Sequence, residues 1–159
     1  MTRAYAATSA SNAAHDGTAR GGCQPKISPG VQSETPAKTE ATVNTAAVAR
    51  HHGVEAFVNM SQMTVTSMSI TETTDSPQHK LHWLAEQALS WSGLPVVTMR
   101  PTVFLEGFFR LFAAPSVRDA DELVLPMGGG KTSPISAVDV ALAVSVILED
   151  PTPHIGQIY

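Results

Sequence analysis

Two short apolar segments that flank an amphipathic helix constrain the fold of this chain most strongly. The segments span residues 56–60 and 95–100. Between them, apolar side chains recur at the i, i+3, i+4, i+7 and i+8 positions of one helical face: Leu81, Leu84, Ala85, Ala88 and Leu89. This spacing predicts a helix that Gly93 ends. A strand, a helix and a second strand in this order predict a parallel pair joined by a right-handed crossover.

The residues around this unit also favour an α/β fold. A helix ending near His52 is expected before the first strand, and another helix is expected over residues 104–112. Residues 122–125 and 154–159 have the composition of short strands. Ser136, followed three residues later by Asp139, resembles the start of a capped helix, which Pro151 ends.

The first 43 residues differ in composition from the rest of the chain. They are mostly Ala, Thr, Ser, Gly and Pro, and their apolar residues follow neither a helical nor a strand period. Such a segment buries too little apolar surface to offset its loss of conformational entropy. We therefore expect a disordered leader over residues 1–43 and an ordered part over residues 44–159.

Composition excludes several classes of protein. A net charge of −4 and a charged fraction of 15% leave no basic excess, so we expect no nucleic-acid partner. No apolar run approaches the roughly 18 residues of a transmembrane helix, so no membrane partner is expected either. The single Cys23 cannot form an intrachain disulfide. These features predict a soluble, cytoplasmic protein.

Most catalytic and binding motifs are absent or incomplete. The sequence contains neither a dinucleotide-binding Gly-x-Gly-x-x-Gly nor a Gly-x-Ser-x-Gly nucleophile motif. The Gly130-Lys131-Thr132 run lacks the first glycine of a phosphate-binding loop and is followed by Ser-Pro, so we interpret it as a turn. His79, His82 and Glu86 share a helical face, but a third convincing ligand is missing, and we predict no metal site.

Ser61 is the strongest candidate that the residues alone provide. It follows an apolar strand, and Arg100, Pro101 and Thr102 follow the next one. In open parallel sheets, ligands bind outside the carboxyl ends of the strands. The alternative is structural: Ser61 would cap its strand and Pro101 would redirect the chain. The two interpretations have equal support from the sequence.

Five segments together resemble NmrA-like proteins, which are atypical members of the short-chain dehydrogenase/reductase superfamily. They span residues 58–62 (VNMSQ), 78–89 (QHKLHWLAEQAL), 92–101 (SGLPVVTMRP), 133–141 (SPISAVDVA) and 150–159 (DPTPHIGQIY). The resemblance implies a partial Rossmann-like fold, a doubly wound parallel sheet. It also implies that the N-terminal nucleotide-binding half of that fold is missing here, so that the chain corresponds to the C-terminal part of such a protein.

The resemblance implies an NAD(P)-binding type of protein, in full-length form a reductase of quinone or azo compounds with a small-molecule substrate. It implies catalytic roles for Ser61 and His82. It implies cofactor contacts at Met60, Ser61, Pro101, Thr102, Val103 and Phe104.

The superfamily's usual Tyr and Lys positions hold Gln78 and His82. A non-catalytic NAD(P)-sensing regulator and a non-functional truncated fragment therefore remain open alternatives. Met68 and Ile70 either cover the substrate or pack as ordinary loop residues. Without the glycine-rich turn we expect weak or no NAD(P)H binding by this chain alone. We also expect self-association through unpaired strand edges.

Overall fold

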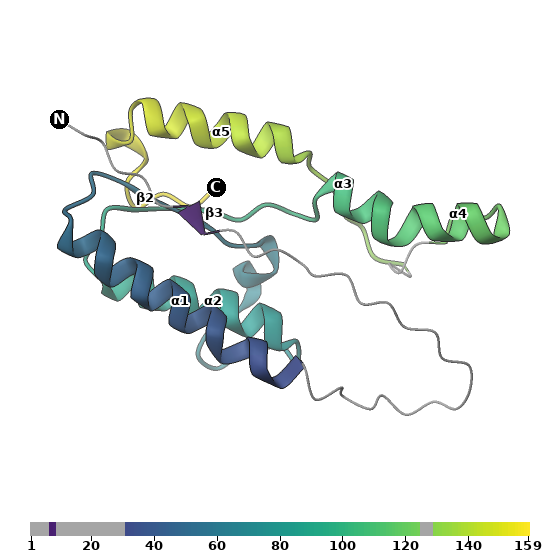
Figure 1. Ribbon diagram of the computed structural model, residues 1–159, viewed down its shortest axis with the longest axis horizontal. Coiled ribbons are helices and arrows are strands. Elements are labelled where there is room, and N and C mark those ends of the chain that lie inside the picture. Colours follow the sequence, from purple (N-terminus) through teal and green to yellow (C-terminus); the bar gives the residue numbers. More distant parts are fainter. Residues whose placement is uncertain (1–6, 9–30, 125–128) are drawn as a thin grey trace.

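The computed structural model describes residues 7–8, 31–124 and 129–159. Its centre is a small parallel sheet in the order β1-β2-β3, formed by β1 (Ala7–Thr8), β2 (Phe57–Met60) and β3 (Val96–Met99) (Figure 1). Strands β2 and β3 pair in parallel from Phe57 with Val96 to Met60 with Met99. The structure thus confirms the strands and the parallel pairing predicted from the sequence.

The last residues of the chain extend this sheet beyond β3. Gly156 N donates to Val96 O at 2.8 Å, and Tyr159 N donates to Thr98 O at 2.9 Å. Ile158 pairs in parallel with Thr98. The predicted terminal strand is therefore present as a short parallel segment, which follows the turn η3 (Thr152–His154).

Helices cover both faces of the sheet. Figure 1 shows α1 (Val31–His51) and α2 (Pro77–Trp91) below the sheet and α5 (Ala137–Glu149) above it. Below, Phe57 packs with Ala46, Ala49 and Leu89, and above, Val58 packs with Ile147 of α5. Because side chains alternate along a strand, consecutive β2 residues contribute to two separate apolar clusters. The chain is a mixed α/β structure.

Helix α2 forms where the apolar spacing predicts it. Ser76 caps it by accepting a hydrogen bond from His79 N at 3.5 Å, and Gly93 adopts a φ of +70° just beyond its end. The buried face of α2 differs from the predicted apolar stripe. Leu84, a member of that stripe, is 45% exposed, whereas Glu86, which is not, is buried. An acidic residue therefore takes a place in the packed face of α2.

Helix α5 also forms as predicted. The Ser136 hydroxyl accepts a hydrogen bond from Asp139 N at 3.0 Å, which satisfies one free N–H of the first turn. Val140 and Ile147 are buried on the inner side of the helix. Among the described helices, none is both long and apolar enough to cross a membrane.

Helix α1 confirms the helix predicted to end near His52, but it begins earlier than the sequence predicts. The sequence predicts a disordered leader over residues 1–43, but the structure places residues 31–43 in α1, and β1 pairs with β2 through Ala7 and Thr8. Among residues 39–43 only Thr42 is buried, and one buried threonine among alanines and threonines gives no helical period. The leader residues 1–6 and 9–30 lie outside the described residues.

The segment after β3 is also longer and less regular than predicted. The expected helix over residues 104–112 is α3 (Leu105–Phe108), which continues through a π-helical turn, η2 (Phe109–Ala113), into α4 (Ala114–Ala120). Asp121 ends it in the left-handed region, with a φ of 54°. Residues 122–124 are irregular rather than strand, and Leu125 lies outside the described residues.

Candidate functional site

The carboxyl ends of β2 and β3 lie side by side and bring two predicted segments together. Ser61 N donates to Met99 O at 2.8 Å, and Met63 N donates to Pro101 O at 3.0 Å. These bonds continue the ladder past the ends of both strands. The adjacency that the sequence predicted for Ser61 and Pro101 is confirmed, and it places them where parallel sheets bind ligands.

Ser61 is buried, with 5% of its surface exposed, and its hydroxyl has no hydrogen-bond partner among the described residues. The same holds for the side-chain nitrogens of Asn59 and Gln62. Buried polar atoms are nearly always paired in folded proteins. This end of β2 can therefore supply hydrogen bonds to a ligand.

Two further predicted residues flank this point. Met60, the last residue of β2, is half-buried and packs against the apolar cluster under α5. His82 is half-buried on α2, one helical turn before Glu86, and it takes part in an interaction of its own. Met60 and His82 therefore belong to opposite sides of the sheet, and their predicted roles stay predictions.

The loop after β3 is held to the segment that precedes α5. The Thr102 hydroxyl donates to Ser133 O. Ile135 N donates to Val103 O at 3.1 Å, and Leu105 N donates to Ile135 O at 2.9 Å, on either side of Phe104. The predicted cofactor-binding residues 101–104 thus form a braced loop beside Ser61.

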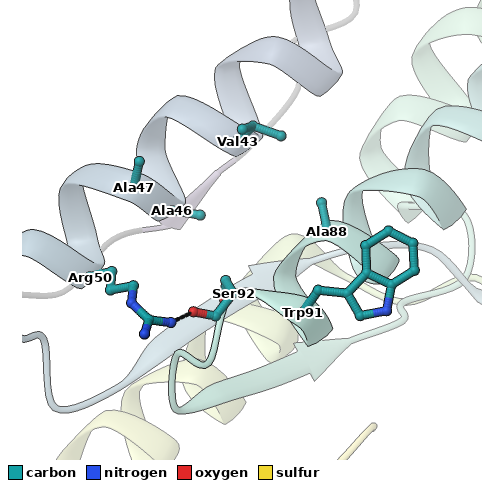
Figure 2. A pocket seen from close by; sticks show the side chains of 7 residues that line it. All are labelled: Val43, Ala46, Ala47, Arg50, Ala88, Trp91 and Ser92. Atoms are coloured by element: carbon teal, nitrogen blue, oxygen red, sulfur yellow. Dashed lines mark hydrogen bonds between the residues drawn. The ribbon is translucent and has the colours of Figure 1, made fainter.

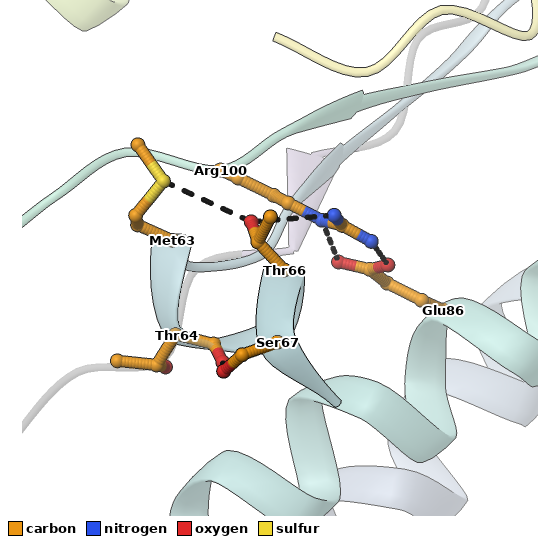
Figure 3. A network of polar contacts seen from close by, with 6 residues as sticks. All are labelled: Met63, Thr64, Thr66, Ser67, Glu86 and Arg100. Carbon is orange, nitrogen blue, oxygen red and sulfur yellow. Dashed lines mark hydrogen bonds and ion pairs between the residues drawn. The ribbon is translucent and has the colours of Figure 1, made fainter. Parts of the chain in front are cut away.

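A partly buried ion pair joins Arg100, the residue that follows β3, to Glu86 of α2 (Figure 3). Arg100 binds Glu86 through both carboxylate oxygens, Nε to Oε1 at 3.0 Å and Nη2 to Oε2 at 2.6 Å. The side chains are only 18% and 7% exposed. The hydrogen bond to Glu86 raises the pKa of Arg100, which keeps the guanidinium charged.

This ion pair also holds the segment η1 (Met63–Ser67), which follows Ser61. Arg100 Nη1 donates to Thr66 Oγ1 at 3.4 Å, and the Thr66 hydroxyl contacts Met63 Sδ at 3.8 Å (Figure 3). Sequence reasoning missed the pair. The sequence does contain a sign of this pair: the acidic residue Glu86 lies between Ala85 and Leu89 on the packed face of an amphipathic helix.

The polar face of α2 does not assemble a metal site among the described residues. Glu86 would have to serve as a ligand together with His79 and His82, but both of its carboxylate oxygens bind Arg100. The turn over residues 129–132 is exposed, and α5 begins only at Ala137, so its described part lacks the helix of a phosphate-binding loop.

A separate hollow of about 330 Å³ lies between α1 and α2 (Figure 2). Arg50 donates to Ser92 O at one end of it and so covers the last turn of α2. Trp91 stands at its rim with 80% of its surface exposed. None of the residues predicted for catalysis or cofactor binding lines this hollow; its walls are Val43, Ala46, Ala47, Arg50, Ala88, Trp91 and Ser92.

Comparison with known proteins gives one informative match. No protein-family model matches the chain. An NAD(P)H azoreductase from Xenophilus azovorans is 33% identical over 97 residues, which is 60% of this chain. Those residues are 33% of the azoreductase, so the match spans about a third of that protein's length. The match associates the chain with NAD(P)-dependent reductases in general terms.

Proposed function

We propose that this chain forms the nicotinamide and substrate end of an NAD(P)H-dependent reductase of quinone or azo compounds. In this proposal its small parallel sheet is part of a doubly wound, Rossmann-like fold of the NmrA-like type. The similarity to an NAD(P)H azoreductase supports the reaction class. The position of Ser61 at the carboxyl end of a parallel strand supports the place of the site.

One observation carries the proposal: the buried Ser61 hydroxyl, without a partner among the described residues, beside the braced loop of residues 101–104. A hydroxyl that is satisfied only when a ligand is bound fits a substrate or cofactor atom. A glycine-rich turn for the pyrophosphate is absent from the sequence. In this proposal the chain contributes contacts to the nicotinamide end of the cofactor rather than to its phosphates.

In this proposal each residue of the site has a separate role. Ser61 would donate a hydrogen bond to the substrate atom that gains charge, which is a form of electrostatic stabilisation. His82 would serve as the side chain that donates or accepts a proton. Residues 101–104 would position the nicotinamide through a loop that is already fixed to Ile135. A bound NAD(P)H supplies the hydride, and the protein supplies orientation.

A chimera tests the proposal. Residues 31–159 of this chain, which begin at the start of α1, replace the corresponding part of the Xenophilus azovorans azoreductase, which contributes the rest of the protein. We expect NAD(P)H-dependent reduction of an azo dye or a quinone, and its loss in Ser61→Ala. Ser90→Ala, at an exposed position of α2, is the matched control. A folded chimera that binds NAD(P)H but reduces neither substrate would contradict the proposal.

A second candidate is an NAD(P)-sensing regulator without turnover. It is favoured by Gln78, an exposed amide on α2 at the position where the superfamily has its phenolic acid. The same chimera separates the candidates. A regulator binds NAD(P)H without oxidising it, whatever acceptor is added.

A further inference from the structure

The hollow between α1 and α2, with a volume of about 330 Å³, has no role in the proposed reductase site (Figure 2). Its walls are side chains of the two helices, and they include Ala46 and Ala47 of α1 and Ala88 of α2. Methyl groups leave space where longer side chains would meet between the helices. The volume lies at the lower end of the range of small-molecule pockets, roughly 300–1,000 Å³. The hollow therefore has the size for one small organic group.

Large apolar side chains border this hollow without being covered. Val43 is 46% exposed and Trp91 is 80% exposed. The indole of Trp91 offers a broad flat face against which another aromatic ring can stack. Exposed apolar surface beside a concave apolar site is typical of a place where a ligand binds. A planar aromatic group would fill the hollow and cover the indole at its rim.

Arg50 supplies a positive charge at one end of the hollow. Its guanidinium donates to Ser92 O, and it packs so closely on Gly93 that a Cβ at that position would lie 2.6 Å from Nη1. Figure 2 shows Arg50 and Trp91 on opposite sides of Ser92. The guanidinium is therefore held beside the hollow, although the residue is exposed.

The bond to Ser92 O leaves most donors of Arg50 available. A guanidinium has five N–H groups in a planar fork, and this bond uses one of them. Within the described part of the chain, no acidic residue forms an ion pair with Arg50. A carboxylate fits the remaining donors, because the fork can bind both of its oxygens. The partial negative charge at the helix ends opposes an anion here, but it acts more weakly than charge-assisted hydrogen bonds in direct contact.

We propose that the hollow between α1 and α2 binds a small aromatic carboxylate, with its ring over the alanines and against Trp91 and its carboxylate on Arg50. The inference goes beyond the proposed reductase function and does not depend on it, because the hollow shares no residue with Ser61 or with residues 101–104. A dinucleotide carries several charges and is larger than this apolar hollow, so NAD(P)H does not fit it.

Titration of the ¹⁵N-labelled full chain tests the site. The probe 2-naphthoate has the ring and the charge, 2-naphthamide has the ring alone, and acetate has the charge alone. We expect 2-naphthoate to shift the Trp91 indole and Arg50 Nε–H resonances saturably, 2-naphthamide to bind about tenfold more weakly, and acetate to have no effect. Trp83, half-buried on α2 and outside the hollow, is the internal reference. Equal affinity for the two aromatic probes, or no shift with 2-naphthoate, would overturn the proposal.

Arg50→Met tests the role of the charge. It should weaken 2-naphthoate binding about tenfold and leave 2-naphthamide binding unchanged, because only the carboxylate loses its partner. Arg110→Met, at an exposed position outside the hollow, is the matched control and should change neither. An Arg50→Met chain that binds 2-naphthoate as tightly as wild type contradicts the assignment.

Ala47→Leu tests the hollow itself and keeps the proposal testable if Arg50→Met does not fold. It fills the hollow from an exposed position of α1, and leucine is nearly as good a helix former as alanine, so the Tm should change little. Binding of both aromatic probes should be lost. Ala41→Leu, exposed on the same helix but outside the hollow, should leave binding intact. Unchanged binding in Ala47→Leu would show that the ligand lies elsewhere and would refute the site.

A second copy of this chain is the competing occupant, and the same spectra identify it. If the Trp91 indole resonance moves with protein concentration and not with 2-naphthoate, the hollow is an interface between copies and the proposal is wrong. The reductase function stands or falls separately, because none of these results changes what the chimera reduces.

Discussion

Glu86→Leu should be among the most destabilising single substitutions in this chain. It leaves the Arg100 guanidinium, whose side chain is only 18% exposed, without the carboxylate that binds it through two hydrogen bonds. Removing one partner of a fully buried ion pair costs about 3–5 kcal/mol, and because the Arg100 side chain is only partly buried we expect about 3 kcal/mol, the lower end of that range. That is a large share of the roughly 5–15 kcal/mol that stabilises a typical domain. For a chain of this size the loss corresponds to a Tm lower by roughly 10 °C.

Thermal unfolding followed by circular dichroism measures this loss. The double variant Glu86→Leu/Arg100→Met removes both charges, so it should recover most of the lost stability. Asp119→Asn is the control, because its partner Arg118 is exposed and such pairs contribute little. A Glu86→Leu Tm equal to that of Asp119→Asn, or a double variant no better than the single one, would refute the reasoning.

The pH dependence of the pair has a definite sign. The hydrogen bond to Glu86 raises the pKa of Arg100, burial opposes this, and the charge of Glu86 adds to it. The stability linked to a raised pKa is present below the unfolded-state value and is lost only as the pH rises through the folded-state value. The Tm difference between wild type and Arg100→Met should therefore stay constant from neutral to mildly alkaline pH. A difference that fell over this range would contradict the assignment.

The remaining predictions concern the ends of the chain, its surface and its cofactor. Deleting residues 1–43 removes β1 and more than half of α1 and should lower the Tm; an unchanged Tm would show both to be dispensable. Ser136→Ala should cost about 1 kcal/mol in thermal unfolding, because it removes the cap on Asp139 N. The chain should self-associate at micromolar concentration in sedimentation, and Leu142→Lys, at a position 59% exposed, should reduce this without lowering the Tm. Calorimetry should find NAD(P)H binding weaker than the low micromolar range, which is about −8 kcal/mol, because the glycine-rich turn is absent.

Elements that carry their own pattern could be predicted from the sequence. Helix α2 has an apolar stripe, a capping Ser76 and a stop at Gly93, all of which act within a few residues. The strands β2 and β3 are short apolar runs on either side of it. The capping bond at Ser136 likewise depends on one residue three positions away. Interactions between residues close in the sequence are therefore sufficient to predict these elements.

Features that depend on distant residues could not be predicted in this way. The part of α1 before Asn44 has Thr42 as the buried residue among residues 39–43, and a buried threonine among alanines and threonines shows no period. The pair of Glu86 and Arg100 joins a helix to a strand end, so a helical pattern treats the acid as an exposed residue. The unpaired donors of Asn59 and Gln62 emerge only once burial and all partners are known. The sequence therefore located the carboxyl ends of the strands but not the chemistry around them.

The central claim is that the carboxyl ends of β2 and β3 bind the nicotinamide end of NAD(P)H. Backbone amide shifts of the full chain, recorded with NADPH and NADH at millimolar concentration (about −4 kcal/mol), test it most directly. The account predicts saturable shifts at Ser61 and at residues 102–104, with none around Trp91 in the hollow between α1 and α2. Saturable shifts confined to that hollow, with the resonances of Ser61 and residues 102–104 unmoved, would contradict it.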